Sequence, residues 1–352
     1  MSCTPRRPHA SKRVTFGLAS RKERLKQPHL SSSALARLAS ELAVRSLEPS
    51  TRRGYGYALK HWSTFTKVYS VAHLPSRSSL ALFVAFLSRR VKDQDKVLSA
   101  LAFHFRPSLP DWDSIRSAPE VLQVLRGARK TAGVSVRRSP PLLPRHLVAL
   151  VRHALRPGAT YDDVLAAAVG TAGFGGLHRP GELAQPNARG DRDPRKVILR
   201  SLVVLNPHTS FAYHLPYHKA DRYWRGSDVV ITAALAPPSF NSVGLLALYL
   251  ARRDARHGRS GALFLRENGK PVTRGWFLPR LETFAPEITG HGLRAGGATF
   301  LASIGVDPAT IKRLGRWSSD AWEIYIRDHP AVNAELQARA ARRPASRPPC
   351  RR

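Results

Sequence analysis

Hydrophobic side chains in the first third of the chain recur at the spacing of an α-helix. Leu35, Leu38 and Leu42 repeat in this way behind serines that can cap a helix, and Pro49 marks where the next helix begins. The stripe of this second helix consists of Tyr55, Ala58, Leu59, Trp62 and Tyr69. Further apolar helices are expected over residues 76–91, over 96–105 and from Pro119 onward. The pattern predicts an all-helical domain over residues 31–135.

A proline-rich linker, residues 136–145, separates this domain from the second half of the chain. Its three prolines forbid a continuous helix. The second domain, residues 146–341, opens with two helices, and strand-like runs follow at residues 197–205, 210–218 and 228–233. Helices resume at residues 243–256 and continue to about residue 340. The expected fold class is mainly α with a small β-sheet, a helical domain followed by a mixed α+β domain.

Charge changes this picture because it indicates a partner. The chain has 57 Lys+Arg against 24 Asp+Glu, a net charge of +33, which favours nucleic acid ahead of a membrane surface as the partner. Residues 1–30 are expected to form a flexible basic arm, or a solvated tail without a specific role, and residues 342–352 a basic tail. Arg137 and Arg138 make the linker a candidate strap along DNA.

The cysteines and the apolar runs exclude other classes of protein. Cys3 and Cys350 are the only cysteines and lie near the ends, which argues against a disulfide framework and excludes a Cys-based zinc site in the core. No apolar run approaches the ~20 residues that span a bilayer, and the basic N-terminus does not resemble a secretory signal. We expect an intracellular protein with no membrane partner.

Two groups of polar residues in the second domain are candidates for chemistry. Arg179 follows a glycine-rich turn predicted at residues 173–176, and Glu182 comes three residues later, a spacing that places both on one helical face. Lys219 ends the middle strand run. Taken alone, these residues are more typical of a surface ion pair and of a solvated lysine.

Two further groups follow toward the C-terminus. His291 and Arg294 share one side of a helix whose next residues are small, which allows another backbone or a ligand to approach closely. Trp317 and Tyr325 lie eight residues apart in a helical segment. Taken alone, the first pair is compatible with a helix cap beside a solvated arginine, and the second with core aromatics.

Taken in order, these groups resemble the active-site set of the tyrosine recombinase (phage integrase) family. The resemblance covers about residues 145–330, and residues 50–135 match the family's helical core-binding domain more loosely. The segment of residues 291–327 is closest to recombinases of eukaryotic mobile elements, DIRS-like or crypton-like. The chain then combines a core-binding domain with a tyrosine recombinase catalytic domain.

The resemblance implies a site-specific DNA recombinase or integrase that works without metal or other cofactor. Tyr325 would attack a DNA phosphate and form a 3′-phosphotyrosyl ester. Arg179 and Arg294 would bind the phosphate oxygens, and Lys219 would protonate the leaving 5′ oxygen. His291 would donate to the phosphate or take the tyrosine proton. Trp317 would donate its indole N–H.

Two departures bear on these roles. The spacing from Trp317 to Tyr325 is one residue shorter than in many relatives, which leaves Arg316 as an alternative phosphate ligand. Glu182 is expected to support its neighbours rather than to take part in the chemistry.

The implied partner is double-stranded DNA bound by a homotetramer that exchanges a C-terminal helix, residues 331–341, between subunits. DNA contacts are expected from Arg52, Arg53, Lys60 and Lys67 and from the two linker arginines. In a eukaryotic host the protein would be nuclear. Two alternatives stay open: a type IB topoisomerase-like enzyme, and a catalytically idle DNA-binding protein derived from a mobile element.

Overall fold

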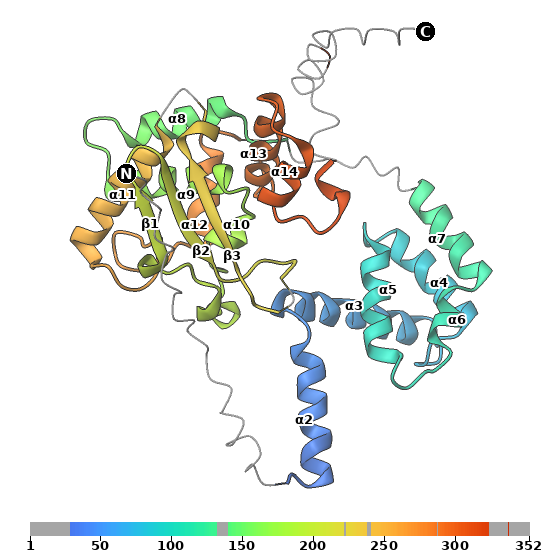
Figure 1. Cartoon of the computed structure of the whole chain (residues 1–352). Helices are drawn as coiled ribbons and strands as arrows, with labels where there is room; N and C mark the ends of the chain where they lie inside the picture. Colours follow the sequence, from blue (N-terminus) through green and yellow to red (C-terminus); the bar gives the residue numbers. More distant parts are fainter. Residues whose placement is uncertain are drawn as a thin grey trace, which may run out of the picture. The chain divides into compact units, whose positions relative to one another are not determined.

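The chain folds into two compact units, residues 1–134 and 135–352 (Figure 1). The structure is a computed structural model that describes residues 29–131, 140–221, 223–237, 241–286, 288–323 and 337. Its elements confirm the predicted fold class, mainly helical with one small β-sheet. No helix in these ranges is long and apolar enough to cross a membrane.

The described part of unit 1 consists of helices. They are α2 (Ser32–Arg45), α3 (Pro49–Val68), α4 (Arg77–Ser88), α5 (Gln94–Phe105), α6 (Trp112–Arg116) and α7 (Pro119–Thr131). Trp62 of α3 lies at the centre of the core, with its ring 4.9 Å from that of Phe83 and 6.0 Å from that of Phe105. The sequence pattern missed α6, because five residues are too few to show a helical period and its anchor is a single buried residue, Trp112.

The first predicted helix, α2, forms without a core. The Ser31 hydroxyl accepts a hydrogen bond from the Ala34 amide at 3.3 Å and starts the helix, yet none of the helix residues is buried. Leu35 and Leu42 keep more than half of their surface exposed. Capping and helix propensity therefore suffice for α2, and the apolar stripe that predicted it stays exposed.

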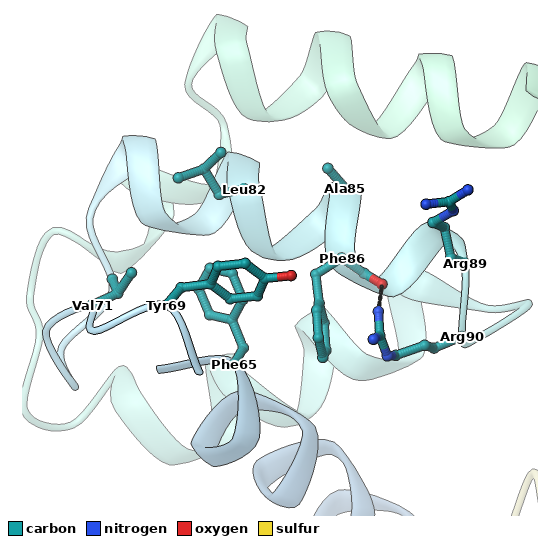
Figure 2. Close-up of a pocket in the computed structure, with 8 residues that line it drawn as sticks. All are labelled: Phe65, Tyr69, Val71, Leu82, Ala85, Phe86, Arg89 and Arg90. Carbon is teal, nitrogen blue, oxygen red and sulfur yellow. Dashed lines mark hydrogen bonds between the residues drawn. The ribbon is translucent and has the colours of Figure 1, made fainter. Parts of the chain in front are cut away.

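A hollow opens at one end of the unit 1 core, between α3 and α4 (Figure 2). Its floor is apolar, with Phe65, Tyr69 and Phe86 among its lining residues, and Arg90 lies at its edge. The Arg90 guanidinium donates to the Phe86 carbonyl at 3.2 Å and covers the Phe86 ring at 3.8 Å. This cation screens part of the aromatic floor from water.

Unit 2 is built around α9 (Tyr161–Gly175), which is buried from Val164 to Phe174. The helices packed on it include α8 (Pro144–Ala154), α11 (Ser242–His257), α12 (Arg274–Glu282) and α13 (Gly292–Ser303). The glycine-rich turn predicted at residues 173–176 is wrong, since α9 continues through Gly175. Both Gly173 and Gly175 allow neighbours to pack against the helix, because a Cβ at either position would lie 3.1 Å from a side-chain atom of Leu293 or Ile231.

The sheet packs against α9 and α11 and runs antiparallel in the order β1-β2-β3 (Figure 1). Its strands are β1 (Val203–Asn206), β2 (Ser210–Leu215) and β3 (Ser227–Thr232). The predicted first strand was too long, because residues 200–202 turn so that the buried Arg200 reaches Asp254 at 2.8 Å. The second ends at Leu215, since Pro216 has no amide to continue the ladder.

The small residues at the start of α13 bring other backbones close. A Cβ at Gly296 would lie 2.0 Å from the Leu142 carbonyl oxygen, and one at Gly297 would lie 2.2 Å from that of Phe174. The Leu142 amide also donates to the Gly292 carbonyl at 2.9 Å. The predicted close approach is therefore confirmed, and the partners are the segment before α8 and the end of α9. This packing sets the positions of the site residues described next.

Candidate active site

Arg179 begins the short helix α10 (Pro180–Leu183) and is fixed there by Glu182. The Glu182 carboxylate accepts hydrogen bonds from the Arg179 amide at 3.2 Å and from its Nη1 at 3.1 Å. Pro180 in the first turn has a backbone suited to a helix start. The ion pair predicted from the three-residue spacing is present, and Arg179 keeps 27% of its side chain exposed.

Glu182 receives two more donors from beyond its own helix. Its Oε2 accepts from His178 Nδ1 at 2.9 Å and from Arg316 Nη2 at 3.3 Å. Burial alone would raise the pKa of Glu182, but the hydrogen bond from His178 and the charges of Arg316 and Arg294 outweigh it and hold the pKa well below its usual range. Glu182 is thus an anion that joins its own segment, residues 178–182, to the loop that carries Arg316.

His178 is completely buried and links Glu182 to the sheet. Its Nε2 lies 2.7 Å from the Tyr213 hydroxyl on β2. Burial raises the pKa of Tyr213, so its hydroxyl keeps the proton and donates to Nε2. Burial, together with the charge of Arg316, lowers the pKa of His178 to about 4, so the ring is neutral and donates from Nδ1 to Glu182. Sequence reasoning missed this chain of hydrogen bonds.

Arg294 lies beneath the site and is only 2% exposed. Its Nη1 donates to the Leu177 carbonyl at 3.0 Å, its Nη2 donates to the Gly315 carbonyl, and its guanidinium lies 4.0 Å from the centre of the Trp317 ring. Arg294 is therefore not the solvated arginine of the simpler interpretation. Through these contacts Arg294, in the first turn of α13, links that helix to the loops that carry Leu177 and Trp317.

Arg316, the alternative phosphate ligand, is turned into the protein. Its Nη2 lies 3.1 Å from the Gly176 carbonyl and 3.2 Å from that of Leu177, in addition to its bond with Glu182. Only 9% of its side chain is exposed. In this arrangement Arg316 holds the loop in place, whereas Trp317 is half-buried beside Arg294.

His291 is exposed and lies where α13 begins, next to the start of α10. A Cβ at Gly290 would lie only 2.6 Å from Cγ of Pro180, so the two backbones pass close together. Partial desolvation of the ring, followed by the charges of Arg179, Lys219, Arg294 and Arg274, lowers the pKa of His291. The four cations thus lie close enough for their fields to act on the imidazole. We call His291 with these four residues the cation cluster.

Arg274 was not predicted from the sequence, where no motif distinguishes it from other arginines. It is the first residue of α12 and is exposed. A Cβ at Gly181 would lie 2.0 Å from an Nη atom of Arg274, so the bare backbone of α10 makes room for this guanidinium. A glycine two residues after Arg179 is the weak signal that could have suggested such an approach.

The remaining predicted residues lie elsewhere. Tyr325, Arg137 and Arg138 are outside the described residues. On α3 of unit 1, Arg52, Arg53, Lys60 and Lys67 are all exposed, whereas Trp62 and Phe65 are buried. Within the part of the chain that the structure describes, no group of three or more His, Cys, Asp or Glu could hold a metal ion.

The helical unit and the mixed unit with its cation cluster together have the fold of the tyrosine recombinases. The XerH site-specific recombinase, solved in a post-cleavage complex with its palindromic difH substrate, matches this chain with a TM-score of 0.56. The alignment covers 89% of this chain and 85% of XerH at 16% identity. At this identity the likeness establishes the fold.

Two other solved structures give lower TM-scores. A lambda integrase tetramer bound to a Holliday junction gives a TM-score of 0.47 at 16% identity over 86% of each chain. The Tn1549 transposon integrase with transposon right end DNA gives 0.45 at 16% identity over 75% of this chain and 85% of that one. No protein-family model and no curated protein matches the sequence.

Proposed function

We propose that this chain is a site-specific DNA recombinase that cuts and rejoins duplex DNA through a covalent 3′-phosphotyrosyl ester on Tyr325. The observation that carries the proposal is the cation cluster. Three arginines and a lysine from separate segments lie near enough to His291 for their charges to lower its pKa, and α10 passes close to both Gly290 and Arg274, within a fold shared with the XerH site-specific recombinase. Positive charge that exceeds what Glu182 neutralises suits a phosphodiester.

The members of the cluster take three kinds of role in phosphoryl transfer: binding of the phosphate, stabilisation of charge and proton transfer. Arg179 and Arg274 bind the non-bridging oxygens, because both side chains reach solvent and carry planar forks of N–H donors. Arg294 is buried next to the cluster's exposed members, and its positive charge stabilises the extra negative charge of the transition state. It also holds the loop that carries Trp317.

Proton transfer falls to His291 and Lys219. The lowered pKa of His291 leaves its imidazole neutral at neutral pH, so it can take the proton of the Tyr325 hydroxyl or donate to a phosphate oxygen. The exposed ammonium of Lys219 gives its proton to the leaving 5′ oxygen. Once the phosphate binds, its negative charge opposes the cations and favours the protonated imidazole.

The exposed cations of α3, which we call its basic face, supply non-specific affinity for the DNA backbone; they are Arg52, Arg53, Lys60 and Lys67. XerH was solved on a palindromic substrate, and we propose that this chain likewise assembles from several copies on its DNA. A homotetramer is the assembly that recombination between two sites requires. The closeness to recombinases of eukaryotic mobile elements, and with it a nuclear location, remains a prediction.

The test is the formation of a covalent protein–DNA adduct on nicked suicide duplexes taken from the sequence that flanks the coding region. Adduct that survives SDS is expected from the wild-type chain and is expected to fall by ~100-fold or more in Arg179→Ala. Arg259→Ala is the matched control, because Arg259 is an arginine of the same unit whose side chain is 80% exposed and which does not belong to the cluster. An equal loss in both variants, or none in Arg179→Ala, would contradict the proposal.

A further inference from the structure

The loop between β2 and β3, residues 216–226, carries Lys219 and folds back on itself. The Asp221 amide donates to the His218 carbonyl at 2.8 Å, which closes a turn with Lys219 at its second position. The Asp221 carboxylate accepts from the Gly226 amide at 2.7 Å. These bonds define the local shape of the turn. They do not tie the loop to the rest of unit 2.

An aromatic pair with two cations supplies that external connection. The rings of Tyr217 and Trp224, from opposite sides of the loop, lie 4.5 Å apart. Lys196 Nζ lies 4.2 Å from the centre of the Tyr217 ring, and the Arg195 guanidinium lies 4.4 Å from that of Trp224. Because aromatic rings in contact attract each other and attract cations above them, these four residues form a single unit, which we call the aromatic clasp.

Arg195, one of the two cations of the clasp, is itself held in place by Asp193. Arg195 and Lys196 belong to a 3₁₀ turn (Pro194–Lys196), and Asp193 accepts from Arg195 Nε at 3.0 Å and from Nη2 at 2.8 Å. This two-pronged bond sets the orientation of the guanidinium over the indole. The clasp therefore connects both sides of the Lys219 loop to a segment that precedes the sheet.

The backbone of Trp224 shows that its position is imposed. Its φ of +55° lies in the left-handed region, which a residue with a bulky side chain rarely adopts. Since the residue is 39% exposed, burial in a core does not account for this conformation. The contacts of the indole in the clasp offset the cost of this unfavourable backbone conformation.

We propose that Trp224 is a positioning residue that holds Lys219 at the cation cluster. The inference rests on the proposed function, in which Lys219 protonates the leaving 5′ oxygen. If the indole is removed, the Trp224 side of the loop loses its link to Arg195 and Tyr217 loses its ring partner, so only the contact between Tyr217 and Lys196 remains. Lys219 then samples positions away from His291. Protonation of the leaving group then slows, while DNA binding through the other cations persists.

The test compares two suicide substrates, one with oxygen and one with sulfur at the 5′ bridging position of the cleaved phosphodiester. A thiolate leaves without a proton, so only defects that act through Lys219 are rescued. Trp224→Ala is expected to cleave the oxygen substrate about 10-fold more slowly than wild type and the sulfur substrate at nearly the wild-type rate. Trp224→Phe, which keeps a ring in the clasp, is expected to retain most activity on both.

Tyr223→Ala is the matched control, because Tyr223 is the neighbouring aromatic residue, is 77% exposed and lies outside the clasp. It is expected to cleave both substrates at the wild-type rate. The proposal is overturned if Trp224→Ala matches wild type on the oxygen substrate. It is also overturned if Trp224→Ala is impaired equally on both substrates, since the defect then does not act through Lys219.

Lys219→Ala, run in parallel, separates this proposal from the role of the lysine. If sulfur does not rescue Lys219→Ala, the assignment of Lys219 as the acid fails, and the clasp is then judged by trypsin cleavage after Lys219 and Arg225 in the folded protein. A held loop is cut slowly, so Trp224→Ala is expected to be cut several-fold faster than wild type and Trp224→Phe. Equal rates of cleavage in Trp224→Ala and wild type would overturn the clasp itself.

Discussion

At the scale of single residues, one buried carboxylate organises the described part of the site. Glu182 accepts from Arg179 at the N-cap of its helix, from His178 just before it and from Arg316 after α14 (Pro308–Leu314). None of these donors needs to contact DNA for the arrangement to matter. They set the direction in which the Arg179 guanidinium faces, and its remaining N–H groups stay available to a phosphate.

His178 makes the stability of unit 2 depend on pH. Its pKa is about 4 in the folded chain against 6.5 for an ordinary histidine, so both states are neutral above pH 6.5 and the unfolded state alone gains a proton below it. The free energy of unfolding should therefore fall by up to roughly 3 kcal/mol between pH 6.5 and 4 through this residue.

Urea unfolding of wild type and His178→Gln at several pH values measures this contribution. The variant cannot titrate, so its free energy of unfolding should change less steeply with pH over that range, whatever its stability at pH 7. The same steepness in both proteins would show that His178 is not the group responsible.

Sequence reasoning could find pairs that lie close along the chain. Arg179 and Glu182 are three residues apart, and their spacing predicted the ion pair. It could not find the contact of Arg316 with Glu182, 134 positions apart, or that of His178 with Tyr213, 35 apart, because only the tertiary fold brings those residues together. Arg274 shows the same limit, since nothing next to it in the sequence indicates a site.

At the scale of elements, long periodic helices were predictable and short elements were not. The helices α3, α4, α5 and α11 appear where the apolar period places them, within two or three residues. The five-residue α6 and the 3₁₀ turns before β1 contain too few residues to show a period. Arg200, in one of those turns, is held by its pair with Asp254, a tertiary contact that overrides the strand propensity of its neighbours.

The close packing of α13 gives a prediction for Gly296. An alanine there places its Cβ against backbone atoms of Leu142, which cannot rotate away as a flexible side chain could. Gly296→Ala should lower the free energy of unfolding of unit 2 by roughly 1–3 kcal/mol, despite the better helix propensity of alanine.

Gly127→Ala is the control for the helix propensity itself. It lies in α7, and a Cβ there would meet nothing within 4 Å. Alanine at this position should raise the free energy of unfolding of unit 1 by about 0.5–1 kcal/mol. Denaturant melts of the two variants give both values. A stabilising Gly296→Ala would show that α13 does not pack as described.

The basic face of α3 gives a prediction about DNA affinity. Replacement of Arg53, Lys60 and Lys67 together by alanine removes three exposed charges from the side of α3 opposite the buried Trp62. The slope of log K against log salt should become less steep by about one unit for each DNA phosphate that the protein no longer neutralises.

The matched control replaces Arg89, Lys92 and Arg126, three exposed cations of unit 1 that do not lie on α3. It makes the same change in net charge and should leave the slope close to that of wild type. If both triple variants change the slope equally, the effect is one of overall charge and the α3 face is merely solvated.

At the scale of the whole molecule, the net charge of +33 attracts polyanions such as DNA. A net charge of this size also speeds their association with the chain, and salt reduces that rate. Attraction of this kind does not distinguish an enzyme from a DNA-binding protein without activity. What distinguishes them is whether a tyrosine becomes joined to DNA at the cation cluster.

The most direct measurement of that claim is SDS-stable adduct formation by wild type and Tyr325→Phe on the same suicide duplex, with DNA affinity measured alongside. The substitution removes one hydroxyl and keeps the ring. We predict a covalent adduct for wild type, none for Tyr325→Phe, and nearly equal DNA affinities. An undiminished adduct from Tyr325→Phe would contradict the account and direct the search to Tyr69, Tyr213 and Tyr217.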